Sequence, residues 1–303
     1  MKIGVSGASG QLGQAVLRYL TARPEPHQVV GISRSAHSVT CADEVRTGDY
    51  NAPNDLEIAY DGLDRLLIIP TLDVRHGARA RQLVAAIDAA GAAGVGHIVL
   101  ISDVGTREEA EPNVGAASWV AEQHLIKSAP CWTILRANYF MESFAQEALL
   151  WLTIGRLVEL GENWVGFVSR DDVAAAAAGI LAGEGHVGAI YNATGPERLT
   201  TVARASLISE ISGRPITVVE TSREDLHRQF HLAGFPQEYF GIAEDTKIKT
   251  VAGGFDILTG DVARLAGRAT VSLEQVLRAQ FTQARSTTTM QPPTGVSDFS
   301  SIR

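Results

Sequence analysis

Lysine and cysteine are both scarce in this chain of 303 residues. The first shortage argues against a nucleic-acid-binding protein, and the second against a cysteine-based metal or redox site. Four lysines, no basic run and a net charge of −8 disfavour a nucleic-acid-binding surface. Cys41 and Cys131 lie far apart and form neither a C-x-x-C motif nor a metal-binding spacing. We therefore expect free thiols, a cytoplasmic location and no nucleic-acid partner.

Long apolar runs and metal-binding patterns are also missing. No apolar stretch is long enough to span a membrane, and the apolar N-terminus is too short and glycine-rich for a signal peptide. His227 and His231 stand four residues apart, but the glutamate of an H-E-x-x-H motif is absent. We expect no membrane association and no bound metal.

Two catalytic motifs are absent as well. None of the six tyrosines is followed four residues later by the lysine of a Tyr-x-x-x-Lys pair, and no G-x-S-x-G elbow occurs. Glu122 and His124, on the helix where the pair would stand, point in different directions, and we expect them at the surface or between lobes. Ordinary alcohol–ketone chemistry is therefore disfavoured, whereas hydride delivery to a quinone or a cationic conjugated system needs little proton transfer.

What is present is a regular alternation of buried strands and helices up to residue 136. Apolar runs that predict strands stand at residues 3–5, 29–33, 45–47, 66–69, 97–102 and 131–136, and helical patterns at 12–20, 53–60, 74–93 and 116–128. Repeated βα units predict an α/β fold, a doubly wound parallel sheet of the Rossmann type with helices on both faces.

The pattern changes after residue 136 and becomes rich in helices. We expect helices at residues 141–154 and 170–181, a strand at 189–193, a helix from Thr200 or Thr201 to 212, a strand at 215–219, and further helices to about 284. The predicted division is an NADP-binding domain over residues 1–152, completed by parts of 165–195, and a smaller α-rich substrate lobe over 153–285. Residues 286–303, rich in Ser, Thr and Pro, read as a disordered tail. The alternative is a tail ordered by a second subunit in a homodimer.

A glycine-rich turn follows the first predicted strand. Gly7, Gly10 and Gly13 form a G-x-x-G-x-x-G spacing between that strand and a helix. Such a turn lets the backbone approach a pyrophosphate, which the N–H groups at the helix start then bind. The alternative is a turn that needs its glycines only for packing.

The end of the second strand indicates which dinucleotide is bound. An NAD site usually has an acidic residue here for the ribose 2′-OH, but this chain has Ser33 and Arg34, with no carboxylate before Asp43. A guanidinium pairs with a 2′-phosphate, so the sequence predicts NADP(H). A solvated loop arginine is the alternative interpretation of Arg34.

Further cofactor contacts are expected at the carboxyl ends of the later strands, where ligands bind in such sheets. Ile69 and Pro70 should lie beside the nicotinamide ribose, and Ser102 should face the same crevice. Asp49 either bonds the adenine or caps an acidic turn.

Taken together, these motifs resemble the NmrA-like atypical short-chain dehydrogenases, in particular the members that reduce quinones and triphenylmethane dyes. The resemblance covers residues 1–280 and is carried by the glycine turn, the arginine after the second strand, and the segments Gly48-Asp49-Tyr50, Ala92-Ala93-Gly94-Val95, Leu135-Arg136, Arg170-Asp171-Asp172-Val173-Ala174, Gly185-His186 and Tyr191-Asn192. It implies a cleft between a Rossmann domain and a small C-terminal lobe.

The resemblance also implies roles for individual residues. The phosphate loop would be formed by Gly7, Ser9, Gly10, Gln11, Leu12 and Gly13, and the substrate would be bordered by Asn138, Tyr139, Phe140 and Met141. Aromatic side chains at the second site suit a flat substrate stacked on nicotinamide, although interlobe packing explains them equally well. The implied activity is NADPH-dependent reduction of a planar conjugated small molecule, such as a quinone, a dye or an enone. The alternative is a non-catalytic redox sensor that binds dinucleotide.

Overall fold

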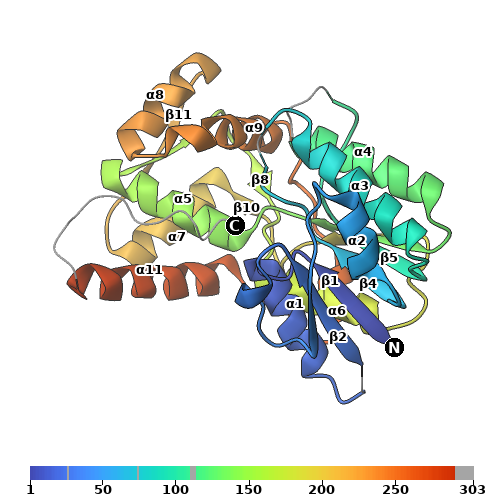
Figure 1. Ribbon diagram of the computed structural model, residues 1–303. Helices are drawn as coiled ribbons and strands as arrows, with labels where there is room; N and C mark the ends of the chain where they lie inside the picture. Colours follow the sequence, from blue (N-terminus) through green and yellow to red (C-terminus); the bar gives the residue numbers. More distant parts are fainter. Residues whose placement is uncertain (26, 74, 110–113, 291–303) are drawn as a thin grey trace.

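Seven parallel strands form a single sheet in the computed structural model, which describes residues 1–25, 27–73, 75–109 and 114–290 (Figure 1). The strand order is β3-β2-β1-β4-β5-β6-β9, so successive strands run outward in one direction from β1 and in the other from β4. Every neighbouring pair is parallel. The strands are β1 (Lys2–Ser6), β2 (Gln28–Ser33), β3 (Glu44–Thr47), β4 (Arg65–Ile68), β5 (His97–Asp103), β6 (Trp132–Ala137) and β9 (Ala189–Ala193).

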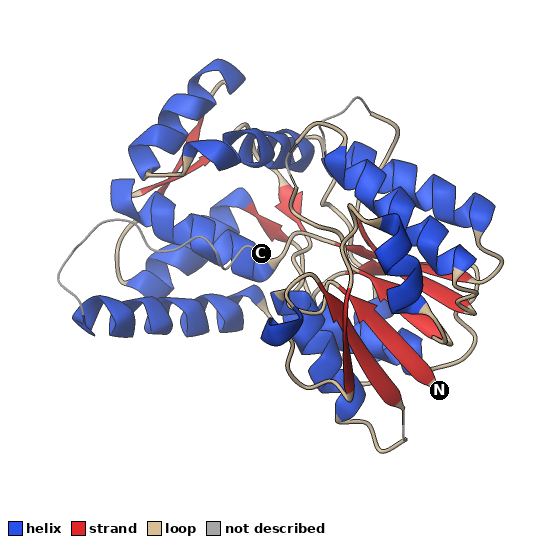
Figure 2. Ribbon diagram, viewed as in Figure 1, coloured by secondary structure: helices blue, strands red, loops and turns tan. Residues whose placement is uncertain are grey.

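Helices cover both faces of this sheet (Figure 2), which confirms the predicted α/β fold of the Rossmann type. One face carries α1 (Gln11–Thr21), α6 (Arg170–Ala182) and α10 (Asp261–Ala266), and the other carries α2 (Pro53–Tyr60), α3 (Ala78–Ala92) and α4 (Val114–Ser128). Side chains of alternate strand residues pack into the cores on opposite faces of the sheet. In β4, Leu67 belongs to the first core, and Leu66 and Ile68 belong to the second. This double burial explains the uninterrupted apolar runs of the sequence.

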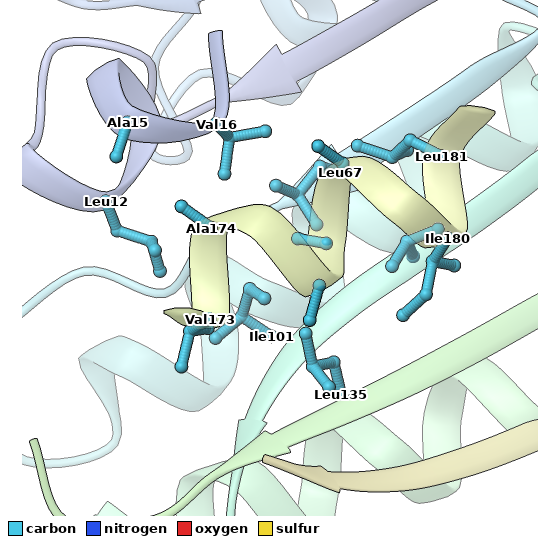
Figure 3. Close-up of a cluster of buried hydrophobic side chains, with 14 of the residues drawn as sticks. Leu12, Ala15, Val16, Leu67, Ile101, Leu135, Val173, Ala174, Ile180 and Leu181 are labelled. Atoms are coloured by element: carbon cyan, nitrogen blue, oxygen red, sulfur yellow. The ribbon is translucent and has the colours of Figure 1, made fainter. Parts of the chain in front are cut away.

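The helix α6 lies beside α1 on the same face of the sheet and packs against both α1 and the strands (Figure 3). The Ser169 hydroxyl caps its first turn by accepting the Asp172 N–H at 3.0 Å. Small side chains allow close packing, and Gly179 allows the closest approach, because a Cβ there would lie 2.1 Å from the Leu265 carbonyl oxygen of α10. The alanine-rich sequence of this helix is therefore a packing requirement.

The second lobe has its own core and only short strands (Figure 2). Large aromatic side chains fill it, including Phe144, Trp151, Phe167 and Phe230. It comprises α5 (Met141–Ile154), β7 (Arg156–Glu159), β8 (Trp164–Val165), β10 (Leu199–Thr200), α7 (Thr201–Ser212), β11 (Thr217–Glu220), α8 (Arg223–Ala233), α9 (Phe240–Val251) and α11 (Leu273–Met290), with a 3₁₀ turn at Gln237–Tyr239. A second 3₁₀ turn, Ala36–Ser38, lies between β2 and β3 of the large sheet. None of the described helices combines the length and hydropathy needed to cross a bilayer.

The observed elements correct several expectations. The helices predicted at 53–60 and 141–154 are confirmed, but the one expected from residue 74 begins at Ala78, after Gly77 in the left-handed conformation. The short strands β7, β8 and β10 were not predicted. The last helix, expected to end at about residue 284, extends as far as Met290; the interpretation of residues 286–303 as a tail stays a prediction, and residues 291–303 lie outside the described part of the chain. The domain boundary at residue 152 stays a prediction; the structure places α5 in the core of the lobe.

Gly179→Ala should destabilise the fold by about 1–3 kcal/mol, because the added methyl group meets the Leu265 carbonyl oxygen and forces α6 and α10 apart. The matched control is Gly91→Ala, in an exposed turn of α3 where no atom lies within 4 Å of the new Cβ. There the better helix propensity of alanine should stabilise by about 0.5–1 kcal/mol. Urea unfolding of both variants measures the difference, and equal midpoints would contradict the packing argument.

Candidate functional site

A cavity of about 870 Å³ lies between the carboxyl ends of the sheet strands and the second lobe. It starts at the loop after β1, where the strand order reverses between β1 and β4, and it ends among the side chains of α5 and α9. The reversal opens a crevice above the sheet, because the connections from neighbouring strands leave in opposite directions. The chain therefore builds one continuous cleft from the sheet edge to the lobe.

The loop after β1 has the geometry of a phosphate cradle. Gly7 has a φ of +92°, and a Cβ at Gly13 would lie 2.3 Å from the Gly7 carbonyl oxygen. Within the described chain no side chain caps the start of α1 at Gly10, so the helix presents its first N–H groups and its positive dipole end to the cleft. Ser9, Gln11 and Leu12 line the cavity beside these glycines. The loop fits the pyrophosphate of a dinucleotide.

The end of β2 forms the next part of the cleft. Ser33 donates its hydroxyl to Ser9 Oγ at 2.7 Å and accepts the Ser35 N–H at 3.1 Å, which joins the ends of β1 and β2. Arg34 is exposed and lines the cavity at this point. An exposed guanidinium beside two serine hydroxyls suits a phosphate group, as the absence of an acidic residue predicts.

The loops after β3 and β4 are tied to each other. Tyr50 donates its hydroxyl to the Ile69 carbonyl oxygen at 3.0 Å, and burial raises the pKa of this phenol to about 12. Asp49 lines the cavity and accepts the Asn51 backbone N–H at 2.9 Å, as in the turn-cap alternative. Ile69 and Pro70 also face the cleft. Tyr50 thus fixes the position of Ile69, the residue expected at the nicotinamide ribose.

Beside the end of β5, an ion pair joins α4 to β6 and corrects the expected position of Glu122. Glu122 is completely buried, not at the surface or between lobes, and it binds Arg136 of β6 through two bonds of 2.9 and 2.5 Å. Ser102 lines the cavity as expected and donates its hydroxyl to Glu122 Oε1 at 2.5 Å. His124, in contrast, is partly exposed and pairs with Asp88. Glu122 therefore positions Ser102 and holds β5 and β6 together.

The segment after β6 divides between cavity and core. Asn138, Tyr139 and Phe140 line the cavity, as the resemblance implied. Met141 is 1% exposed, belongs to the core of the lobe and does not contribute to the lining, so its side chain follows the packing alternative. The Tyr139 ring stands 5.4 Å from that of Phe255, centroid to centroid. The two rings are tilted by 33° to each other and make an apolar wall on one side of the cleft.

Against this wall lies a buried group of charges that the sequence did not reveal. Tyr139 donates its hydroxyl to Glu147 Oε2 at 2.6 Å, and the Lys247 ammonium binds Glu147 and Glu159, the latter at 3.0 Å. The Arg204 guanidinium lies 3.6 Å from Glu159. Two acids and two bases balance, which allows all four to be buried.

The charges in this group determine their own pKa values. Burial alone would raise the pKa of Glu147, but Lys247 and the hydrogen bonds from Tyr139 and Trp151 outweigh it, so the pKa is lowered. Burial likewise opposes the charge on Lys247, and the two carboxylates still raise its pKa. Burial, reinforced by Glu147, raises the pKa of Tyr139 well above its ordinary value. The tyrosine therefore stays protonated, with its hydroxyl held by Glu147.

The fold and the cleft together define a dinucleotide-binding protein of the Rossmann type. The chain belongs to the NAD(P)H-binding family, whose model matches residues 7–184. It is 28% identical to quinone oxidoreductase 2 of Escherichia coli over 92% of this chain and 98% of that protein. It is 27% identical to the NAD(P)H azoreductase of Xenophilus azovorans, over 86% and 93% of the two chains.

A solved structure agrees with this assignment. Triphenylmethane reductase from Citrobacter sp., crystallised with NADP(H), superimposes with a TM-score of 0.81 at 28% identity, over 92% of this chain and all of that one. The expected resemblance to the NmrA-like reductases is confirmed. Among the described residues, no group of three or more His, Cys, Asp or Glu side chains is placed to hold a metal ion.

Lys247→Met should destabilise the protein by about 3–5 kcal/mol, because it leaves Glu147 and Glu159 buried, with Arg204 beside Glu159 as the one remaining basic partner that the described residues provide. Adding Glu147→Gln should recover part of this loss, since it removes one of the stranded charges. Urea unfolding of the two single variants and the double variant measures the coupling, and strictly additive losses would contradict it.

The same network sets a pH dependence. Because the folded pKa of Glu147 lies below its unfolded value, its contribution is present above the unfolded pKa and is lost as the pH falls through the folded one. The acid limb of the stability curve should therefore be shallower for Glu147→Gln than for the wild type.

Proposed function

We propose that this protein is an NADPH-dependent reductase that transfers hydride to a planar conjugated small molecule. The observation that carries the proposal is the continuous cleft, which joins a phosphate cradle to a wall of aromatic rings. Known reductases of quinones, azo compounds and triphenylmethane dyes, similar to this chain over most of its length, support the same conclusion. A flat acceptor stacked between nicotinamide and the aromatic wall would fill such a cleft.

The roles assigned to the residues follow from their positions. Gly7, Ser9, Gly10, Gln11, Leu12 and Gly13 hold the pyrophosphate, Ser33 and Arg34 hold the 2′-phosphate, Asp49 faces the adenine end, and Ile69, Pro70 and Ser102 border the nicotinamide half. When bound, NADPH supplies the hydride. Asn138, Tyr139 and Phe140 orient the acceptor and exclude water from it. We further infer a cytoplasmic enzyme, and we retain the homodimer as an alternative.

An acceptor screen tests this activity. The purified protein should oxidise NADPH in the presence of at least one member of a panel of naphthoquinones, azo compounds, aryl enones and cationic triarylmethane dyes, followed at the NADPH absorbance band. The control is the same panel without protein. Tight NADPH binding without turnover of any acceptor, combined with different affinities for NADPH and NADP⁺, would instead identify a redox sensor.

Arg34→Ala should raise the Kd of NADPH by roughly tenfold, because an arginine that pairs with a phosphate contributes charge-assisted hydrogen bonds. The Kd of NADH, which lacks the 2′-phosphate, should change by less than about twofold. Titration of tryptophan fluorescence or calorimetry measures both constants. An unchanged NADPH affinity would return Arg34 to the role of a solvated loop residue.

A further inference from the structure

A lysine enters the cleft from α9, where no sequence motif marks it. Lys249 lines the cavity, and its Nζ lies 4.7 Å from the centroid of the Phe255 ring. Because the Phe255 ring packs against that of Tyr139, the ammonium lies at the edge of the aromatic wall. The stem of the side chain packs on Gly105, where a Cβ would lie 3.2 Å from Lys249 Cε. Lys249 thus stands over the loop that follows β5, on the carboxyl side of the sheet.

The neighbouring acids are engaged by other groups. Asp103 binds the Arg79 guanidinium at 3.0 Å and accepts the Ser118 hydroxyl at 2.5 Å, and Glu109 pairs with Arg107. In the described part of the chain no carboxylate forms an ion pair with Lys249. A half-buried ammonium in this position has hydrogen-bond donors to offer to a ligand.

The surrounding charges also affect its proton. Burial lowers the pKa of Lys249, Asp103 and Glu109 oppose this effect, and Arg107 and Arg79 reinforce it. On α9 itself, Asp245 lies one turn earlier and faces the same cavity, and burial together with Glu244 raises its pKa. The net result is an ammonium that gives up its proton more readily than a solvated lysine does.

We propose that Lys249 is the proton donor of the cleft and that it makes neutral acceptors, quinones above all, the preferred substrates over cationic dyes. This inference rests on the proposed reductase function. It assigns the missing Tyr-x-x-x-Lys role to a lysine from the second lobe, which reaches the end of β5 from the opposite side of the cleft.

The reaction balances with this assignment. A hydride adds two electrons and one proton to a neutral quinone and leaves a hydroquinone monoanion. The Lys249 ammonium then donates its proton to the anionic oxygen, so an O–H bond forms as an N–H bond breaks, and bulk water reprotonates the amine. A triarylmethane cation becomes neutral on accepting hydride and needs no proton. For such a dye, Lys249 supplies only like-charge repulsion.

Binding measured without turnover tests directly whether the Lys249 ammonium contacts a bound ligand. The probes are 4-nitro-1-naphtholate, a planar oxyanion, and the neutral 1-nitronaphthalene, each titrated at pH 8 into protein saturated with NADP⁺. Lys249→Met should weaken naphtholate binding roughly tenfold or more, because it removes a charge-assisted hydrogen bond in a partly desolvated site. The Kd of nitronaphthalene should stay within about twofold. Lys127→Met, in the exposed last turn of α4, is the matched control and should alter neither constant.

Turnover measurements test whether Lys249 donates the proton. Lys249→Met should lower kcat for 1,4-naphthoquinone by roughly 100-fold, the size of effect typical of a general acid, and leave the rate with a cationic triarylmethane dye unchanged or higher. The wild-type quinone rate should fall as the pH rises through the pKa of Lys249, and the variant should lose this limb. Lys249→Gln is a second variant, and thermal unfolding of both shows whether the fold is intact.

The outcomes separate the two proposals. If the wild-type protein reduces no acceptor, the proposed function fails, and the naphtholate titration still decides the contact. If the wild type reduces quinones and Lys249→Met does so at the same rate, the proton-donor assignment is overturned and the reductase function stands. Equal naphtholate affinity in the wild type and Lys249→Met overturns the contact itself.

Discussion

The close approach of α1 to the end of β1 is the constraint on which the rest of the site depends. A Cβ at Gly13 would collide with the Gly7 carbonyl oxygen at 2.3 Å, so the turn can form only with glycine at that position. This contact aims the start of α1 at the point where the sheet order reverses. The N–H groups and dipole of the helix then point to the carboxyl edge of the sheet, where the loops of neighbouring strands leave space for a ligand.

The second lobe supplies what the sheet lacks. Its aromatic wall is held from behind by Glu147, Glu159, Lys247 and Arg204, whose charges cancel in the interior. The hydroxyl of Tyr139 is hydrogen-bonded to Glu147 of this network, so the ring presents only its apolar surface to the cleft. The apolar surface of the cleft wall and the support of the lobe are thus two consequences of the same buried group.

The same arrangement explains how a short-chain reductase fold functions without its usual catalytic pair. The helix α4, where the pair would stand, instead carries Glu122, which is buried against Arg136 and holds Ser102 in place. That helix therefore stabilises the pairing of β5 with β6. The cationic group nearest to the aromatic wall comes from α9, so the lobe that shapes the acceptor site also carries the chemistry we assign to it.

The sequence by itself was enough to predict the parallel sheet, the glycine turn between a strand and a helix, and the place of Arg34 at the end of β2. These features follow from local patterns: double burial produces apolar runs such as that of β4, and a phosphate turn needs glycines at fixed spacing between a strand and a helix. The helix start expected at Thr200 or Thr201 is correct for the same reason, since the Thr200 hydroxyl caps only the residues that follow it.

Only the tertiary structure decided which side chains of the lobe face the cleft. Met141 and Tyr139 are two residues apart, yet Met141 lies in the core of the lobe and Tyr139 lines the cavity. The chain changes direction between them, because α5 begins at Met141. Glu147 meets Lys247 across 100 residues, and Lys249 reaches the loop after β5 from a helix almost 150 residues further along the chain. Such contacts follow from how the lobe folds back over the sheet, and no spacing in the sequence encodes them.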